Sequence, residues 1–298
     1  MPRETLLFLI DDYWVNIKCR RSLNSLLGEK QYLNATLHLI EYAYERNISG
    51  AAKRYREIAS DAVKRHLTGR QRWSEGSEEK LWKAFESRCK KPAGNRKAIK
   101  RNPLVDPLRP SSKTKVNLIT FIWNLKEDNT VASWAFSLIS AGKAREAYRK
   151  LKTIYGIRHK IAAFYLRDIF WLGHSLNPPL KMKNPVDAKY LQPIDVWILR
   201  ATKALGVKNP SRQDCIEAML AIEKEYNLPF GGANIAFWNL GATYIGNEKD
   251  FKVVVSQLFG KQNHSDTSRV ENAIQYMKRV SKFEKHISDS FARKRLSI

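Results

Sequence analysis

Apolar side chains recur at helical spacing along most of the chain. In residues 31–46 they fall at Leu33, Leu37, Ile40 and Tyr44, three or four positions apart, which is the spacing of one buried helix face. No convincing run alternates between apolar and polar residues as a half-buried strand would. The pattern therefore predicts an all-α fold.

The other predicted helices show the same periodicity. They cover residues 5–27, 51–67, a segment that starts at Ser77, and residues 116–127, 130–141, 143–154, 160–172, 195–205, 211–226, 232–245, 248–259 and 267–294. Residues 174–192 contain Pro178, Pro179 and Pro185, and we expect them to be irregular.

A segment rich in lysine, arginine and proline interrupts the helical pattern between residues 88 and 115. It is typical of a long connection, either a solvated linker or an extended segment that lies along DNA. The sequence therefore predicts four regions. They are a basic helical N-terminal region (1–87), the linker (88–115), a helical core (116–260) and a basic C-terminal helix packed on that core (261–298).

The charge balance indicates a polyanionic partner. Lysine and arginine number 53 against 29 aspartates and glutamates, which gives a net charge of +24 and a pI of about 10.0. Such an excess favours encounter with nucleic acid through counterion release. Ribosomal, RNA-binding and membrane-surface proteins can be equally basic, so charge alone does not identify the polyanion.

Cysteine usage and hydropathy narrow the protein class further. The three cysteines, Cys19, Cys89 and Cys215, form no CxxC pair, so neither a structural zinc site nor a four-cysteine iron–sulfur cluster is expected. A sparse, odd count suits a reducing compartment. The apolar run Leu6–Ile10 is too short for a signal peptide or a membrane span. We expect a cytoplasmic, nucleoid-associated protein without a membrane partner.

Two short motifs carry candidate chemistry. Gly156–Ala162 is a glycine turn that leads into a helix beginning with Lys160, and Asp195 stands 35 residues later at the start of another helix. A lysine amine can attack a sugar carbon, and a carboxylate can stabilise the positive charge that develops there. Either residue alone is usually an ordinary surface or capping residue. Their occurrence in this order, in a basic helical chain, favours cleavage of a glycosidic bond in DNA.

The segment from Lys143 to Asp195 resembles the helix-hairpin-helix DNA glycosylase superfamily. The resemblance implies that Lys160 is the Schiff-base nucleophile and Asp195 the essential aspartate. It also implies that Gly156, Arg158 and His159 contact DNA. The usual hairpin has a second glycine, and this chain has Arg158 in its place. An altered hairpin geometry or an added phosphate contact are both compatible with that change.

The long interval between the motifs is most similar to that of the archaeal 8-oxoguanine (GO) glycosylases. That resemblance implies a base pocket with Phe164 and Trp238 on its two stacking faces, although core packing explains such aromatic residues equally well. Asn234 stands where the family has an acid, and an amide both donates and accepts hydrogen bonds. The leading substrate is therefore an 8-oxoguanine-like base, with a hypermodified base in phage DNA as the alternative.

These motifs predict a DNA glycosylase with an associated Schiff-base lyase step that cuts the strand at abasic sites. The predicted partner is double-stranded DNA with a modified or damaged base, and the protein is expected to be a monomer. No cofactor or metal is expected, and a monovalent cation at the hairpin is left open. Two alternatives remain: an antiviral glycosylase acting on phage DNA, and a helix-hairpin-helix protein that binds DNA without catalysis.

Overall fold

The described part of the chain is mostly helical. The structure is a computed structural model of the 298-residue chain, and it describes residues 2–14, 24–27, 31–44, 49–66, 77–93, 103–125, 130–174 and 183–259. No strand occurs among these residues, and the closest approach to one is an isolated parallel bridge between Val116 and Ile154. The predicted all-α class is confirmed. The predicted helix 267–294 lies outside the described residues.

The chain divides into two compact units. Unit 1 combines Met1–Arg20 with Ile194–Ile298, and unit 2 is Arg21–Pro193. This division differs from the four predicted regions, because the chain's first helix belongs with its C-terminal third. Helical periodicity shows which face of a helix is buried but not which distant helix covers it.

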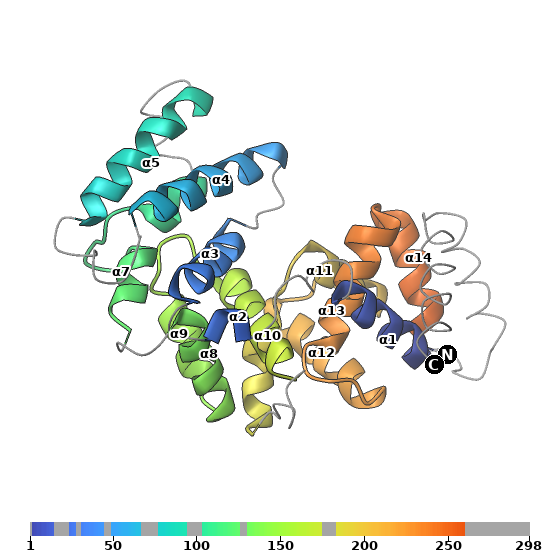
Figure 1. Ribbon diagram of the computed structural model, residues 1–298. Helices are drawn as coiled ribbons and strands as arrows, with labels where there is room; N and C mark the ends of the chain where they lie inside the picture. The colour runs from blue at the N-terminus through green and yellow to red at the C-terminus, as the bar shows by residue number, and fades with distance from the viewer. Residues whose placement is uncertain are drawn as a thin grey trace, which may run out of the picture. The chain divides into compact units, whose positions relative to one another are not determined.

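Unit 1 is a cluster of helices in which the N-terminal helix packs on a C-terminal one. Its elements are α1 (Pro2–Asp12), α11 (Val196–Ala204), α12 (Arg212–Glu225), α13 (Gly232–Asn239), the π-helical turn η6 (Leu240–Ile245) and α14 (Glu248–Phe259). Figure 1 shows α1 beside α13. The buried Asn239 amide joins them by donating to the Leu9 carbonyl at 2.9 Å and to the Asp12 carboxylate at 3.0 Å.

Among the described residues, unit 2 contains more elements than unit 1. They are α2 (Asn24–Leu27), α3 (Tyr32–Ala43), α4 (Ser49–His66), α5 (Ser77–Ala93), the 3-10 helix η4 (Pro103–Leu108), α7 (Leu118–Trp123), α8 (Val131–Ser140), α9 (Ala144–Leu151), α10 (His159–His174) and the 3-10 helix η5 (Pro185–Leu191). Helix α10 contacts α3, α8, α9 and η5, and every residue from 161 to 170 is buried. It is therefore the central helix of the unit.

A buried ion pair lies in the middle of α10. Arg167 and Asp168 are 0% and 1% exposed, and the guanidinium binds the Asp168 Oδ1 atom at 2.9 Å through both Nε and a terminal nitrogen. The Tyr42 hydroxyl from α3 donates to the other carboxylate oxygen. Because charges inside a protein are costly unless they are paired, this cluster fixes α10 against α3.

The predicted linker 88–115 is partly folded into unit 2. Helix α5 continues to Ala93, and η4 follows at Pro103–Leu108. Leu108 is fully buried, and the Asn117 side chain, which caps α7, donates to the Leu108 carbonyl at 2.9 Å. The basic, proline-rich composition indicated solvated chain, but a few apolar residues suffice to anchor part of the segment.

Removal of the Asp168 carboxylate should strongly destabilise unit 2. Asp168→Ala leaves the buried Arg167 guanidinium without its countercharge, and we expect the free energy of unfolding to fall by about 3–5 kcal/mol. Urea titration followed by circular dichroism measures this loss.

The matched control is Glu146→Ala, which breaks the exposed pair between Glu146 and Lys150 on α9. Exposed pairs contribute little to stability, so the unfolding midpoint should hardly change. Equal effects of the two substitutions would show that the buried pair has no special role.

Candidate active site

The Gly156 motif forms a tight hairpin between α9 and α10. The Ile154 amide donates to the Leu151 carbonyl at 3.1 Å, and the Ile157 amide donates to the Ile154 carbonyl at 3.3 Å. Helix α10 begins directly afterwards at His159. The predicted order of helix, glycine turn and helix with lysine in its first turn is therefore present.

A neighbouring segment of chain holds this hairpin in place. Val116 exchanges two backbone hydrogen bonds with it, donating to the Thr153 carbonyl and accepting from the Tyr155 amide, each at 3.0 Å. The Lys115 ammonium donates to the Lys152 carbonyl at 2.6 Å. The turn is thus fixed by residues outside the motif.

Both the backbone conformation at position 156 and the neighbouring side chains require a glycine there. Its φ angle is +72°, in the region that favours glycine. A Cβ atom there would lie 3.1 Å from the Asp106 Cβ atom and from two ring carbons of Pro107. Any other residue would combine backbone strain with crowding against η4.

Arg158 and His159 are exposed at the end of the hairpin. The Arg158 side chain forms no hydrogen bond or ion pair with any residue that the structure describes, so its guanidinium can reach a ligand. His159 bonds through Nδ1 to the Tyr148 hydroxyl, and the Tyr148 ring packs on Tyr190 with centroids 5.1 Å apart. Tyr148 thus orients the imidazole.

Lys160 is the second residue of α10 and is partly exposed. It lies in the first helical turn, at the positive end of the helix dipole. The following ten residues are all buried, so the backbone that carries Lys160 is anchored in the core of unit 2.

Phe164, one turn further along α10, is 4% exposed. The Arg167 guanidinium carbon lies 4.3 Å from its ring centroid, and the Tyr42 ring is 5.7 Å away. Both are within unit 2. The predicted stacking face of this ring is therefore partly covered by an arginine and a tyrosine.

Asp195 is the N-cap of α11, as the sequence predicted. Its Oδ1 atom accepts from the Trp197 amide at 2.9 Å and from the Ile198 amide at 3.1 Å. Because one oxygen takes both capping bonds, Oδ2 is not used by the cap. The residue as a whole is partly exposed, but its Oδ2 atom is buried.

Asn234 and Trp238 lie one turn apart on α13. Asn234 is 1% exposed, whereas Trp238 is partly exposed and meets Tyr13 edge to face with centroids 5.7 Å apart. Both stay candidates for a base pocket. The same helix runs into Gly241, where a Cβ atom would lie 2.3 Å from the Trp197 indole, so α11 and η6 pack in close contact.

The candidate residues are distributed over the two units. Unit 2 carries five of them and unit 1 three, namely Gly156, Arg158, His159, Lys160 and Phe164 in the former and Asp195, Asn234 and Trp238 in the latter. The structure describes each group within its own unit. The sequence had not indicated the supporting residues Val116, Pro107 and Tyr148, because no local pattern links them to the hairpin.

Other chemistries find little support in the described residues. Burial raises the pKa of the Cys89 thiol to about 12 and also raises the pKa of Cys215, so neither is a thiolate at neutral pH. Nowhere in the described ranges do three His, Cys, Asp or Glu side chains gather as metal ligands would. No described helix combines the length and apolarity needed to cross a membrane.

Comparison with known proteins identifies no relative. No family model, no curated protein and no solved structure matches the chain.

Replacement of Gly156 by alanine should destabilise the hairpin. We expect Gly156→Ala to lower the free energy of unfolding by about 1–2 kcal/mol from backbone strain and by at least about 1 kcal/mol more from contact with Pro107. Chemical denaturation measures the total.

Gly246→Ala separates the two contributions. Gly246 has nearly the same φ angle, +76°, but nothing lies within 4 Å of a Cβ atom there. This control should show the strain without the crowding. If both variants lose the same stability, the contact between the hairpin and η4 is unimportant.

Proposed function

We propose that this protein is a DNA glycosylase that excises a modified or damaged base and then cleaves the abasic strand through a Schiff base. The observation that carries this proposal is the Gly156 hairpin, which is held by contacts with Pro107 and Val116 and places Lys160 in the first turn of a buried helix. A rigid nucleophile is what such chemistry requires, because misplacement of a reacting atom by about 1 Å can cost about 100-fold in rate.

In the proposed reaction, the neutral amine of Lys160 attacks C1′ of the sugar. The bond from C1′ to the base breaks, and the base leaves with the bonding electrons and a proton. The bond between C1′ and the ring oxygen then breaks, the oxygen takes a proton, and a protonated imine forms between Lys160 and C1′. This imine acidifies the protons on C2′. Loss of one C2′ proton to a base forms the C2′–C3′ double bond, and the 3′ phosphate leaves with the electrons of its bond to C3′.

Asp195 has the complementary role. A carboxylate stabilises the positive charge that develops on the sugar as the base departs. The cap on α11 favours this role, because it orients the side chain through Oδ1 alone. The second oxygen takes no part in the capping bonds and is buried, so the proposed role requires the site to open to the sugar.

The hairpin is proposed to bind a DNA phosphate beside the reacting nucleotide. Amides at the start of α10 favour an anion, and the exposed Arg158 adds a guanidinium that can contact phosphate oxygens in a bidentate manner. Arg158 would therefore compensate for the second glycine that the hairpin lacks.

The leading substrate is an 8-oxoguanine-like base, with Asn234 as the candidate reading residue and Phe164 and Trp238 as the candidate stacking residues. The alternative is a hypermodified base in phage DNA, removed in antiviral defence. The partly covered ring of Phe164 and the buried amide of Asn234 mean that either base would require these side chains to move. Release from duplexes that carry each base, beside phage DNA with modified cytosines and unmodified DNA, distinguishes the two.

A second candidate function is DNA binding without catalysis. One observation favours it: the capping bonds alone give Asp195 a structural purpose. In that case the hairpin serves only as a phosphate clamp. Lys160→Gln would then weaken DNA binding by no more than one phosphate contact, and no substrate would yield an abasic product.

Lys160→Gln should abolish the covalent intermediate. Borohydride reduces the imine and traps the protein on DNA that contains an abasic site or an excisable base, and a gel shift measures the adduct. We expect the wild-type protein to form it and the variant to form none, because glutamine has no amine.

Lys150→Gln is the matched control, since Lys150 is an exposed lysine on α9 whose ammonium pairs with Glu146. It should trap as the wild type does. An undiminished adduct in Lys160→Gln would remove Lys160 from the role of nucleophile, and no adduct in the wild type would remove the lyase step.

Asp195→Asn should separate catalysis from folding. Asparagine caps a helix as well as aspartate does, so stability and DNA affinity should stay close to those of the wild type. Base release should fall at least about 100-fold, because the negative charge is lost. Single-turnover release measured beside a melting curve tests this, and wild-type release by the variant would leave Asp195 as a cap only.

A further inference from the structure

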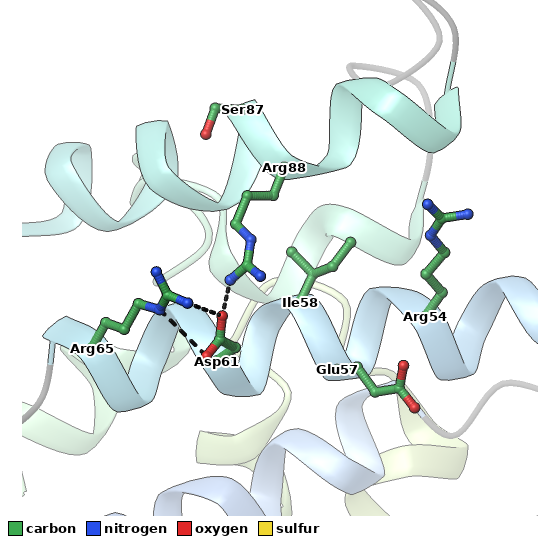
Figure 2. A pocket seen from close by; sticks show the side chains of 7 residues that line it. All are labelled: Arg54, Glu57, Ile58, Asp61, Arg65, Ser87 and Arg88. Carbon is green, nitrogen blue, oxygen red and sulfur yellow. Dashed lines mark hydrogen bonds and ion pairs between the residues drawn. The ribbon is translucent and has the colours of Figure 1, made fainter.

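A pocket of about 690 Å³ lies between α4 and α5, within unit 2. Figure 2 shows the two helices side by side with the lining side chains between and around them. The lining residues are Arg54, Glu57, Ile58, Asp61, Arg65, Ser87 and Arg88. Three arginines and two carboxylates leave one positive charge in excess.

Two guanidinium groups from different helices meet at one carboxylate in this pocket. Asp61 accepts from Arg65 of the same helix, with a terminal nitrogen at 3.2 Å and Nε at 3.4 Å. Arg88 of α5 binds the same carboxylate. Each guanidinium has five N–H donors, and Asp61 uses only some of them, so the remaining donors are held in place for another acceptor.

Arg54 is the third guanidinium, and it makes no hydrogen bond or ion pair with any described residue. In Figure 2 its side chain extends from α4 towards α5, while that of Glu57 extends away from α5. Arg54 is also exposed. An incoming anion can therefore reach its guanidinium without displacing a carboxylate of the described residues.

Stability alone does not account for these arginines. The side chains of the two ion pairs are exposed, by 68% for Arg65, 43% for Arg88 and 37% for Asp61, and exposed pairs contribute little to folding. The two helices are in contact, and each also buries apolar residues, such as Val63 on α4 and Phe85 on α5. The ion pairs therefore leave these guanidinium groups accessible to a ligand.

We propose that this arginine pocket binds a backbone phosphate of duplex DNA, as a second contact besides the hairpin. Guanidinium groups match phosphate oxygens in geometry and charge, and a pocket of this size accommodates a phosphate with its adjoining sugar. The strongly basic chain favours a nucleic acid over a small anion. The inference rests on the DNA-binding part of the proposed function and is independent of its chemistry.

Arg54→Gln should weaken binding of the full-length protein to a short unmodified duplex by roughly tenfold at low salt. The slope of log affinity against log salt concentration should become shallower by about 1, because one phosphate contact is lost. Fluorescence anisotropy at several salt concentrations measures both. Arg88→Gln should act in the same direction.

Arg56→Gln is the matched control, because it removes the same charge from the same helix at a position that does not line the pocket. It should leave the affinity and the salt slope near their wild-type values. Equal losses in Arg54→Gln and Arg56→Gln would mean that only the general charge of α4 matters, and unchanged binding in Arg54→Gln would remove the pocket as a DNA contact.

Two further measurements separate the possible sources of phosphate and the two proposals. Titration with inorganic phosphate and with a nucleoside monophosphate should show no binding that depends on Arg54 at concentrations where DNA binds. If a small anion does bind in a manner that depends on Arg54, and the affinity for the duplex is unchanged in Arg54→Gln, the ligand is a small anion and the proposal is overturned. At saturating abasic DNA, Arg54→Gln should give the wild-type borohydride adduct, and loss of the adduct would contradict the separation of this pocket from catalysis.

Discussion

The positive φ angle at Gly156 is the constraint on which the candidate site depends. It allows the chain to turn sharply from α9 into α10, and the turn packs against Pro107 while Val116 bonds to Thr153 and Tyr155 just before it. Because these contacts come from distant parts of unit 2, the hairpin is held by tertiary structure and not by its own sequence. The backbone that carries Arg158 and Lys160 is consequently fixed in position.

The central helix continues this rigidity into the core. Residues 161–170 are buried without interruption. Within this stretch Arg167 forms an ion pair with Asp168, and the Asp168 carboxylate accepts a hydrogen bond from Tyr42 of α3. A buried ion pair is seldom the most stable solution, since apolar residues can replace it. Here it also places a guanidinium on Phe164, so the core is coupled to a candidate pocket residue.

The sequence predicted local features well and long-range ones poorly. Helical spacing, the glycine turn and the Asp195 cap depend on neighbours within one or two turns, and all three are present. The bond from Tyr42 to Asp168 spans 126 residues, and no periodicity encodes it. The same limit explains why the sequence predicted neither the burial of Leu108 in the linker nor the division of Lys160 and Asp195 between two units. The base pocket and the excised base stay predictions.

The most direct test of the central claim is to map the cross-linked residue in the borohydride-trapped complex by peptide mass spectrometry. A lysine that attacks C1′ keeps the reduced sugar after digestion of the DNA, because the C–N bond is then a stable amine. We predict that the sugar remnant lies on Lys160. A remnant on another lysine or on the terminal amine, or a protein that carries none, would contradict the account.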